Sequence, residues 1–513
     1  MLEVPTGPAT PRPLLDAGYT VGLLAAAILS GYGLLAPERL GLLMESEPPA
    51  RVVASINPRV SDQPPAPPAK TLQTARLTPD ARRARARPVP DVRPAPQPAQ
   101  PERPRGTWSG AVSGKVLDQD GQALVGASVV GGGVETRVGD DGAFTVTPPP
   151  DATLIVKRPG YMKVSVEPTP MKGPLEVVMR PQAIKAAYLT YFGFGDRTIR
   201  SRVLDLLERT ELNAVVIDVK GDRGWIIYPT RVEQALAIGA QGPATLRDFD
   251  GMMADLKARG VYTIARIVTF KDNILATRRP DLAVLDARTG KPWTDRENLA
   301  WVDPFREEVW NYNVAIAKEA VERGFDEVQF DYVRFPTDGK LQAAKYLKPV
   351  TKETRLPTIA AFLELARKEL GARGAYVAAD LFGYTAFNEN DTDIGQRIEE
   401  LAPHLDYLCP MVYPSGYHVG IPGFRNPVQN SYAVVRESVR LMRRRAGHTP
   451  ARVRPWLQDF KDYAFDRRIF GISEIRDQIR GTDEGGGTGW MLWNPRNDYT
   501  GAALRAKSPL AAR

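Results

Sequence analysis

The sequence predicts an α/β fold: a (β/α)8 TIM barrel preceded by a small β-sandwich, a disordered Pro/Arg-rich linker and an N-terminal transmembrane helix. After residue 183, eight apolar strand-like runs alternate with amphipathic helical runs, which is the pattern of repeated βαβ units. Eight such strands over about 310 residues match a closed barrel. Shorter alternating runs precede them, and an uncharged stretch lies near the start of the 513-residue chain.

Residues 1–47 contain that uncharged stretch, at positions 17–36. Twenty mostly apolar residues are long enough, as a helix, to cross the roughly 30 Å hydrocarbon core of a bilayer. A cleaved signal peptide is the alternative, but no A-x-A site follows and Pro37-Glu38-Arg39 interrupts the pattern. We therefore expect a single-pass anchor, whose orientation the flanking charges do not decide.

Residues 48–106 are dominated by Pro, Ala and Arg, a composition that predicts a disordered, extended spacer. Between Arg51 and Arg105 there are 11 Lys/Arg and 4 Asp/Glu, so this segment holds +7 of the net charge of +8. The rest of the chain is close to neutral and has no basic stripe, so no nucleic-acid partner is expected.

Residues 107–182 consist of short alternating runs separated by Gly, Pro and Asp turns, which predicts a small β-sandwich. The run G-K-V-L-D-x-D-G-x-x-L-V-G-A-S-V at 114–129, followed by D-G-A-F-T-V at 141–146, resembles the carboxypeptidase regulatory-like fold. That family is non-catalytic, so the resemblance implies a spacer or accessory domain.

Residues 183–513 hold the predicted barrel. A doubly wound open sheet is the competing fold, but the first strand is followed only by a weak match to the G-x-G-x-x-G motif, at 189–195. The predicted helices are 199–207, 249–259, 307–323, 359–370, 434–445 and 472–480. The predicted strands are 187–193, 214–220, 262–270, 328–335, 376–382, 407–413, 453–460 and 489–494.

The second and third strands carry charged side chains. Asp218 and Lys220 share a strand face because side chains alternate. They could bridge each other inside the barrel or contact substrate, and the sequence weighs equally for both. Arg266 lies among apolar neighbours in the third strand, and arginine is rarely buried unpaired, so we expect it to orient a carboxylate such as Asp331 or Asp218.

The fourth strand, in the run F-D-E-V-Q-F-D-Y-V-R-F-P at 325–336, carries Asp331 near its end and Arg334 shortly after. Chemistry in a parallel barrel sits at the C-terminal strand ends, and the fifth strand places Asp380 at the same level. Two such carboxylates can cleave a glycosidic bond, one as nucleophile or base and one as acid. Asp331 and Arg334 reach one site only if the strand ends near Tyr332 and the backbone turns.

The last three strands add aromatic and amide side chains. Trp and Tyr present flat apolar faces with a polar handle, which suits sugar rings, although any one of these aromatics could equally be barrel core. A histidine in the loop after the sixth strand could line the site or be an ordinary loop residue. The predicted sugar-binding residues in these segments are Tyr413, His418, Trp456, Gln458, Trp493 and Asn494.

Residues suited to binding a metal are scarce. The chain has three histidines and one cysteine, Cys409, and no two histidines lie at a metal-ligand spacing. No metal or other cofactor is expected, and a metal-dependent deacetylase is disfavoured.

Three segments, 214–221, 330–336 and 490–495, resemble the glycoside hydrolase-like barrels of the DUF4015 family. They are also similar to other glycosidase-like barrels with an F-D-Y-x-R-F-P fourth strand. The resemblance covers about residues 186–500 and implies that Asp331 lies in the active site. Asp380 is our own choice of partner, made from its position in the fifth strand.

These features predict a glycoside hydrolase anchored in a bacterial-type cell envelope, with its barrel outside the cytoplasm and a polysaccharide as substrate. Asp331 would be nucleophile or stabilising base and Asp380 general acid, with Arg266 and Arg334 fixing or tuning them. The alternative is a non-catalytic glycan-binding or envelope-assembly protein, which a separation of these carboxylates above ~10 Å would favour over the spacings used by glycosidases.

Overall fold

The computed structural model describes residues 106–168, 173–243, 246 and 248–507. The predicted membrane helix at 17–36 lies outside these residues, and so does the predicted linker up to residue 105. Within the described part of the chain, no helix is both long enough and apolar enough to cross a membrane.

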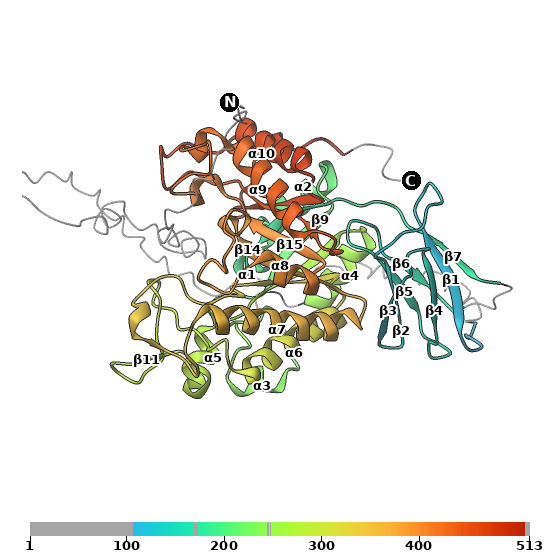
Figure 1. The fold of residues 1–513 in the computed structure, drawn as a ribbon, viewed down its shortest axis with the longest axis horizontal. Helices are drawn as coiled ribbons and strands as arrows, with labels where there is room; N and C mark the ends of the chain where they lie inside the picture. The colour runs from blue at the N-terminus through green and yellow to red at the C-terminus, as the bar shows by residue number, and fades with distance from the viewer. Residues whose placement is uncertain (1–105, 169–172, 244–245, 247, 508–513) are drawn as a thin grey trace, which may run out of the picture. The chain divides into compact units, whose positions relative to one another are not determined.

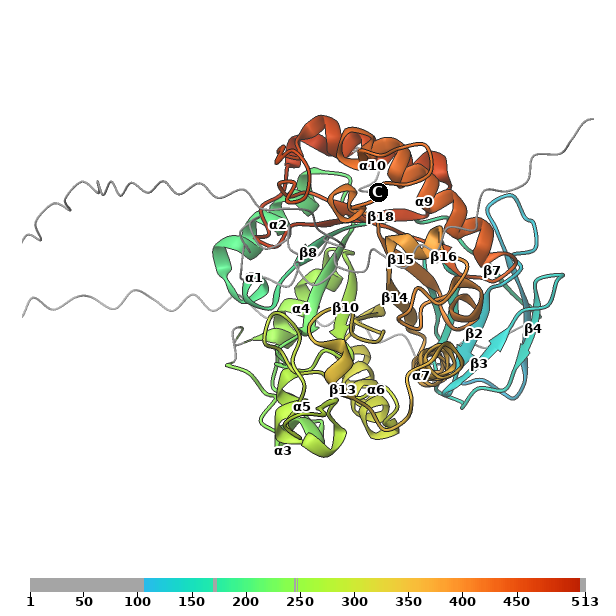
Figure 2. The ribbon, with the colours of Figure 1, turned by 60° about the vertical axis from the view of Figure 1, so that its left-hand side comes forward.

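Eight parallel strands close into a barrel, in the order β8, β9, β10, β12, β14, β15, β17 and β18 (Figure 1, Figure 2). The last strand pairs in parallel with the first, which completes the closure and confirms the predicted barrel. The strands are apolar and buried on both faces, as expected of a parallel sheet covered by helices. Their bounds are β8 Ile184–Leu189, β9 Ala214–Lys220, β10 Tyr262–Val268, β12 Glu327–Asp331, β14 Tyr376–Phe382, β15 Tyr407–Met411, β17 Trp456–Gln458 and β18 Gly489–Trp493.

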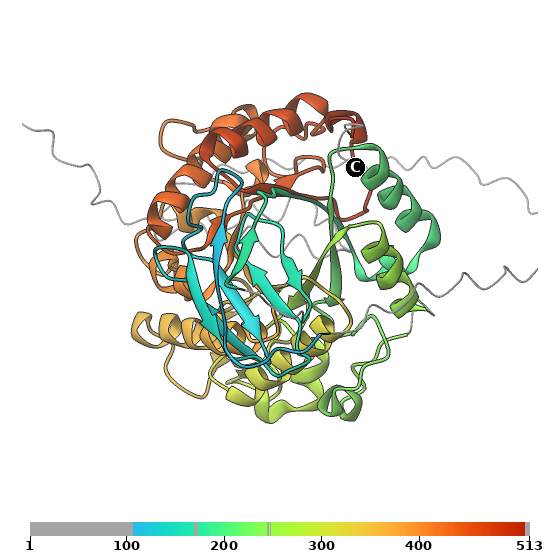
Figure 3. The ribbon, with the colours of Figure 1, turned by 90° about the vertical axis from the view of Figure 1, so that its right-hand side faces the viewer.

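Helices surround the strands on the outside of the barrel (Figure 3). The bounds of two helices agree most closely with the predicted ranges: α4, predicted over 249–259, and α6, predicted over 307–323. The helices are α1 Tyr191–Gly195, α2 Arg197–Arg209, α3 Glu233–Ala237, α4 Phe249–Ala258, α5 Asn273–Arg278, α6 Glu307–Glu322, α7 Lys352–Gly371, α8 Ile398–Leu401, α9 Ser431–Ala446 and α10 Ile472–Gly485. A two-stranded ribbon, β11 Leu285–Asp286 with β13 Ala344–Lys345, lies outside the barrel sheet.

A separate apolar cluster fills the inside of the barrel. Its members recur at every second residue of each strand, such as Ala186 and Tyr188 in β8, because strand side chains alternate between faces. Continuing the same alternation reaches Asp218 in β9, Arg266 in β10 and Asp380 in β14. The polar side chains therefore collect at the C-terminal end of the barrel.

The first strand lies earlier than predicted, at Ile184–Leu189 instead of 187–193. Helix α1 begins where the strand was expected to continue. Thr190 caps this helix, since its hydroxyl accepts a hydrogen bond of 2.9 Å from the amide of Gly193. The run Y-F-G-F-G at 191–195 is therefore a helical turn.

Two other strands differ from the prediction by more than two residues. The fourth ends at Asp331 instead of 335, because Tyr332 has a φ of +49°, a left-handed conformation that is unusual for an aromatic residue and turns the chain. The seventh, predicted over 453–460, is divided into β16 Arg452–Val453 and β17. Pro455 separates the two pieces because it has no amide hydrogen for the strand ladder.

Residues 112–178 form two sheets around a core of their own. One sheet has the order β4, β1, β7 and the other β3, β2, β5, β6. Kinship with the carboxypeptidase regulatory-like fold, and the exact domain boundaries, stay predictions. The strands are β1 Val112–Leu117, β2 Ser128–Gly131, β3 Val134–Arg137, β4 Ala143–Val146, β5 Leu154–Lys157, β6 Val164–Val166 and β7 Leu175–Val178.

Candidate active site

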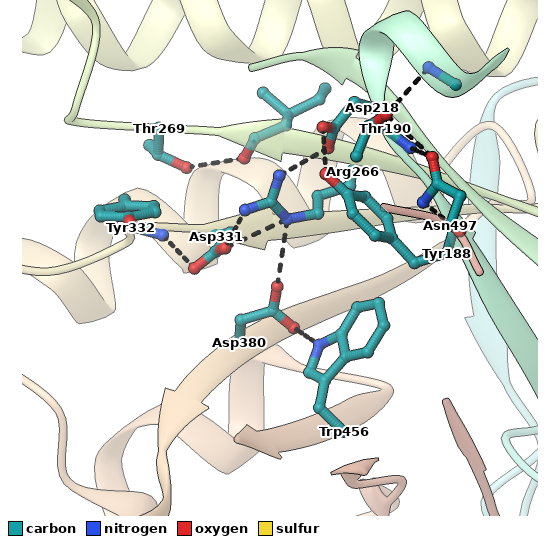
Figure 4. Close-up of polar contacts among 12 residues, drawn as sticks. Tyr188, Thr190, Asp218, Arg266, Thr269, Asp331, Tyr332, Asp380, Trp456 and Asn497 are labelled. Carbon is teal, nitrogen blue, oxygen red and sulfur yellow. Dashed lines mark hydrogen bonds and ion pairs between the residues drawn. The ribbon is translucent and has the colours of Figure 1, made fainter. Parts of the chain in front are cut away.

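One arginine lies at the centre of the polar side chains that collect at the C-terminal strand ends (Figure 4). Arg266, in β10, faces carboxylates from β9, β12 and β14. Its Nη1 is 2.5 Å from Oδ1 of Asp218, and its Nη2 forms an ion pair with Asp331. Its Nε lies 3.9 Å from Oδ2 of Asp380. All four side chains are buried, so their mutual charges are weakly screened.

Asp331 is held by donors on both of its carboxylate oxygens. Oδ2 accepts hydrogen bonds from Nε of Arg266 at 3.1 Å and from Nη2 of the same guanidinium. Oδ1 accepts one of 2.6 Å from the backbone amide of Tyr332. The left-handed turn at Tyr332 ends the strand immediately after Asp331. The local backbone therefore fixes the carboxylate at the edge of the barrel.

Asp380 occupies a different environment from Asp331. Its Oδ1 accepts a hydrogen bond of 2.7 Å from Nε1 of Trp456. Burial raises the pKa of Asp380 well above the usual carboxyl value, the charge of Asp331 raises it further, and Arg266 only partly offsets this. Oδ2 of Asp331 and Oδ2 of Asp380 lie 3.1 and 3.9 Å from the same Nε of Arg266, so they are at most 7.0 Å apart.

Tyr188 is a member of this cluster that the sequence prediction missed. Its hydroxyl donates a hydrogen bond to Oδ2 of Asp218. The pKa of Asp218 is raised overall, because the effect of burial outweighs those of Arg266 and this hydroxyl, which lower it. The available signal was strand alternation, which places Tyr188 on the inward face of β8. The predicted range of the first strand, 187–193, put Tyr188 at its N-terminal end, so its position near the C-terminal end of β8 was missed.

Aromatic rings line the cluster on the side of the last strands. Trp493 stacks on Tyr188 with ring centroids 4.0 Å apart, and Trp456 meets Trp493 edge to face at 5.3 Å. The guanidinium of Arg266 lies 5.1 Å from the ring centroid of Trp493. Tyr413 is buried beside the acids. Burial raises the pKa of its hydroxyl most, and the charges of Asp380 and Asp331 raise it further. Trp456, Trp493 and Tyr413 thus lie beside the cluster, and their sugar-binding role stays a prediction.

Lys220 lies apart from this cluster. Its Nζ donates to Oδ2 of Asp272 at 2.7 Å, and both side chains are fully buried. Asp272 also caps α5, accepting a hydrogen bond of 2.9 Å from the amide of Leu275. Lys220 and Asp218 do not bridge each other. A register shift between β9 and β10 just after Asp218 separates the two side chains.

Several other predicted sugar-binding residues make structural contacts. Nε2 of Gln458 donates a hydrogen bond of 2.7 Å to the hydroxyl of Ser415. Its Oε1 accepts one of 3.1 Å from the backbone amide of Ser415. Asn494 donates to the backbone carbonyls of Asp459 and Asp498. Both amides therefore hold loops at the mouth of the barrel.

Arg334 is expected to fix or tune the acids, and it does interact electrostatically with Asp331: burial lowers the pKa of Arg334, and the charge of Asp331 partly offsets this. Its direct contacts lie elsewhere. It donates to the carbonyl of Phe335 at 3.0 Å, and its guanidinium lies 4.8 to 5.2 Å from the ring centroids of Tyr332, Trp301 and Phe382. The expected backbone turn near Tyr332 does occur, but it brings Arg334 into this group of rings.

The charges of the cluster are arranged around a guanidinium. Within the described residues, no group of three His, Cys, Asp or Glu side chains has an arrangement that could hold a metal ion. The position between the carboxylates is taken by Arg266 (Figure 4).

Fold and site together define a parallel eight-stranded barrel with buried carboxylates at the C-terminal ends of its strands. The chain belongs to the DUF4015 family, described as "Putative glycosyl hydrolase domain", whose model matches residues 186–499. None of the curated proteins compared with the chain matches it.

Three of the solved structures that are similar to parts of the chain are the following. A hypothetical protein from Ruminiclostridium thermocellum is 36% identical, with a TM-score of 0.34 over 38% of this chain and 96% of that one. The PgaB (BpsB) glycoside hydrolase domain from Bordetella bronchiseptica is 15% identical, with a TM-score of 0.46 over 64% of this chain and 100% of that one. The spore cortex-lytic enzyme SleL from Bacillus megaterium is 12% identical, with a TM-score of 0.38 over 69% and 76%.

Proposed function

We propose that this protein is a glycoside hydrolase that cleaves a polysaccharide outside the cytoplasm with the carboxylate pair Asp331 and Asp380. Family membership supports the reaction class. The observation that carries the assignment of residues is the contrast between the two acids. Asp331 accepts three hydrogen bonds, two of them from a guanidinium, whereas burial and the charge of Asp331 raise the pKa of Asp380. Two acids in such different surroundings can take different roles, and the raised pKa suits Asp380 to that of proton donor.

The proposed reaction divides the work between these groups. Trp456 holds Oδ1 of Asp380, which leaves Oδ2 to carry the proton that goes to the glycosidic oxygen as its bond to the anomeric carbon breaks. Asp331 either attacks the anomeric carbon or takes a proton from the attacking water. The bound of 7.0 Å between the Oδ2 atoms covers the spacing of retaining enzymes and the lower part of the inverting range.

Arg266 and Asp218 are positioning residues in this proposal. The guanidinium holds Asp331 in one orientation and offers positive charge beside it. Asp218, itself fixed by the hydroxyl of Tyr188, holds the other side of the guanidinium. A carboxylate fixed before the substrate arrives needs no reorganisation in the transition state.

The proposed location follows from the uncharged stretch at 17–36 and the Pro/Arg-rich segment after it. An anchor of that length with a spacer of more than fifty residues would let the barrel act on an envelope polysaccharide at a distance from the membrane. Fractionation of cells after alkaline carbonate washing tests this, since an anchored protein stays with the membranes.

The test of the activity is release of reducing ends from bacterial envelope polysaccharides by the purified full-length chain. The matched control is Asp331→Asn, prepared in the same way. We expect release by the wild-type protein and none by the variant. Equal release by both proteins would point to a contaminating enzyme, and release by neither from any envelope polysaccharide would refute the proposed function.

A further inference from the structure

A line of aromatic rings leads from the buried carboxylates towards the surface. Tyr413, whose pKa reflects the charges of Asp380 and Asp331, meets Phe460 edge to face with centroids 5.5 Å apart. The ring of Phe460 is parallel to that of Tyr463, at 7° and 6.3 Å. The three rings are thus in continuous contact, and they form an aromatic surface whose outer part is Phe460 and Tyr463.

The line also becomes more exposed as it leaves the carboxylates. Tyr413 is buried, while Phe460 and Tyr463 are each partly exposed. Tyr413 follows β15, and the other two rings lie in the loop after β17. Both segments start from the C-terminal ends of barrel strands, the same end as Asp331 and Asp380.

Two polar atoms beside this surface lack a hydrogen-bond partner among the described residues. They are Nε2 of His418 and the hydroxyl of Tyr463, and both are buried. Their rings are 6.4 Å apart, centroid to centroid. Buried polar atoms are nearly always satisfied in folded proteins, so two neighbouring exceptions call for a ligand that supplies the partners.

Hydrogen bonds join the loop after β15 to the loop after β17. The hydroxyl of Ser415 donates to Oδ1 of Asp462 at 2.6 Å, and Gln458 donates to the same hydroxyl at 2.7 Å. Asp462 in turn accepts hydrogen bonds from the amides of Phe465 and Arg467, both at 2.9 Å. This network holds the aromatic surface in place without substrate, which lowers the entropy cost of binding.

We propose that Phe460 and Tyr463 form a subsite for a second pyranose ring of the substrate. It lies next to the sugar whose glycosidic bond is cleaved at Asp331 and Asp380. The apolar face of the sugar stacks on the two rings. Its hydroxyl groups bond to Nε2 of His418 and to the hydroxyl of Tyr463. The protein therefore takes an oligosaccharide or polysaccharide chain as substrate and binds single sugars poorly. This inference rests on the proposed function and adds a second sugar-binding subsite to it.

The test is calorimetric titration of the full-length chain with four defined probes: the hexasaccharides of cellulose, chitin, chitosan and starch. Phe460→Ala removes one ring of the surface, and Tyr463→Phe removes only the hydroxyl. Matched controls are Phe192→Ala, at a phenylalanine that is 46% exposed on α1, and Tyr432→Phe, which loses a tyrosine hydroxyl bonded to Glu484 on the outer helices. Melting curves verify that every variant is folded.

We expect the wild-type protein to bind at least one hexasaccharide more tightly than the matching disaccharide. Phe460→Ala should weaken that binding by about tenfold, and Tyr463→Phe by about fivefold, while both controls leave it unchanged. If Phe460→Ala fails to fold, Tyr463→Phe decides alone.

Unchanged binding by Tyr463→Phe and Phe460→Ala would overturn the subsite, and so would the absence of binding by all four hexasaccharides. These results are independent of hydrolysis. Binding that depends on Phe460, without release of reducing ends, would support the subsite and refute the hydrolase. Release of reducing ends that is equally length-dependent in Phe460→Ala would do the reverse.

Discussion

At the scale of single residues, the site depends on one guanidinium shared by three carboxylates. Arg266 touches Asp218 and Asp331 directly and lies 3.9 Å from Asp380. A change at any one of these acids alters both the chemistry and the balance of buried charge. Activity and stability must therefore be measured together for each variant.

We expect Asp331→Asn to lower kcat by about a thousandfold or more, because the amide keeps the shape of the carboxylate but loses the charge that stabilises the transition state. Arg266 keeps Asp218 as its partner, so the free energy of unfolding should fall by less than the roughly 3–5 kcal/mol typical of a broken buried pair. The measurements are kcat per folded molecule and the melting temperature. A large fall in melting temperature with kcat per folded molecule unchanged would show that Asp331 is structural.

Asp380→Asn should lower kcat less on aryl glycosides with good leaving groups than on the polysaccharide, because good leaving groups need little proton donation. In the wild-type protein, Asp380 donates only while protonated, so kcat should fall as pH rises through its raised pKa. The variant should lose this alkaline decline. A pH profile of kcat measures it, and an identical decline in both proteins would assign the proton to another group.

At the scale of elements, the ends of strands decide which side chains meet. Strand β9 has the predicted bounds, yet the register shift beside β10 sends Asp218 towards Arg266 and Lys220 towards Asp272. Lys220 thereby joins β9 to the first turn of α5. Its contribution belongs to the stability of the barrel.

Lys220→Met should lower the free energy of unfolding by about 3–5 kcal/mol, because it leaves the carboxylate of Asp272 buried without its cation. The catalytic constant per folded molecule should stay the same. The double variant Lys220→Met with Asp272→Asn should recover part of the loss, since it removes both charges. Denaturant unfolding measures this, and a lower kcat with stability unchanged would return Lys220 to the substrate site.

At the scale of the whole molecule, residues 112–178 contact the barrel through buried and partly buried polar groups. Glu135 forms a bidentate ion pair with Arg367 of α7, at 2.6 and 2.8 Å. Lys157 donates to the carbonyl of Ala375 at 2.7 Å. Removing residues 1–182 would leave Arg367 and the backbone at Ala375 without these partners. We therefore expect the barrel alone to be less stable than residues 107–513.

Glu135→Gln tests this contact through its pH dependence. Burial raises the pKa of Glu135, but Arg367 and Lys157 outweigh it and lower the pKa from 4.5 to about 2. The carboxylate therefore stabilises the fold above pH 4.5, and this contribution is lost as pH falls towards 2. The variant should be less stable than wild type by about 3 kcal/mol at pH 7 and equal to it near pH 2. A difference that does not change with pH would contradict the ion pair.

The sequence alone was sufficient for the barrel, because alternating apolar strands and amphipathic helices are local patterns. It also placed Asp331 and Asp380 near strand ends and named Arg266 as a partner for a carboxylate, because these inferences need only approximate strand positions. At β8 the predicted range 187–193 put Tyr188 at the start of the strand instead of near its end, and Tyr188 was missed.

Only the tertiary structure decided which of these side chains meet. The sequence named Asp331 and Asp218 as candidate partners of Arg266 and left open which of them it meets. Its pairing with both, and that of Lys220 with Asp272, depends on strand register and on one left-handed residue, Tyr332. These contacts join residues about fifty or more positions apart, and many acids in the chain could have served each base. Pairing is set by the geometry of barrel closure, which no local pattern in the sequence contains.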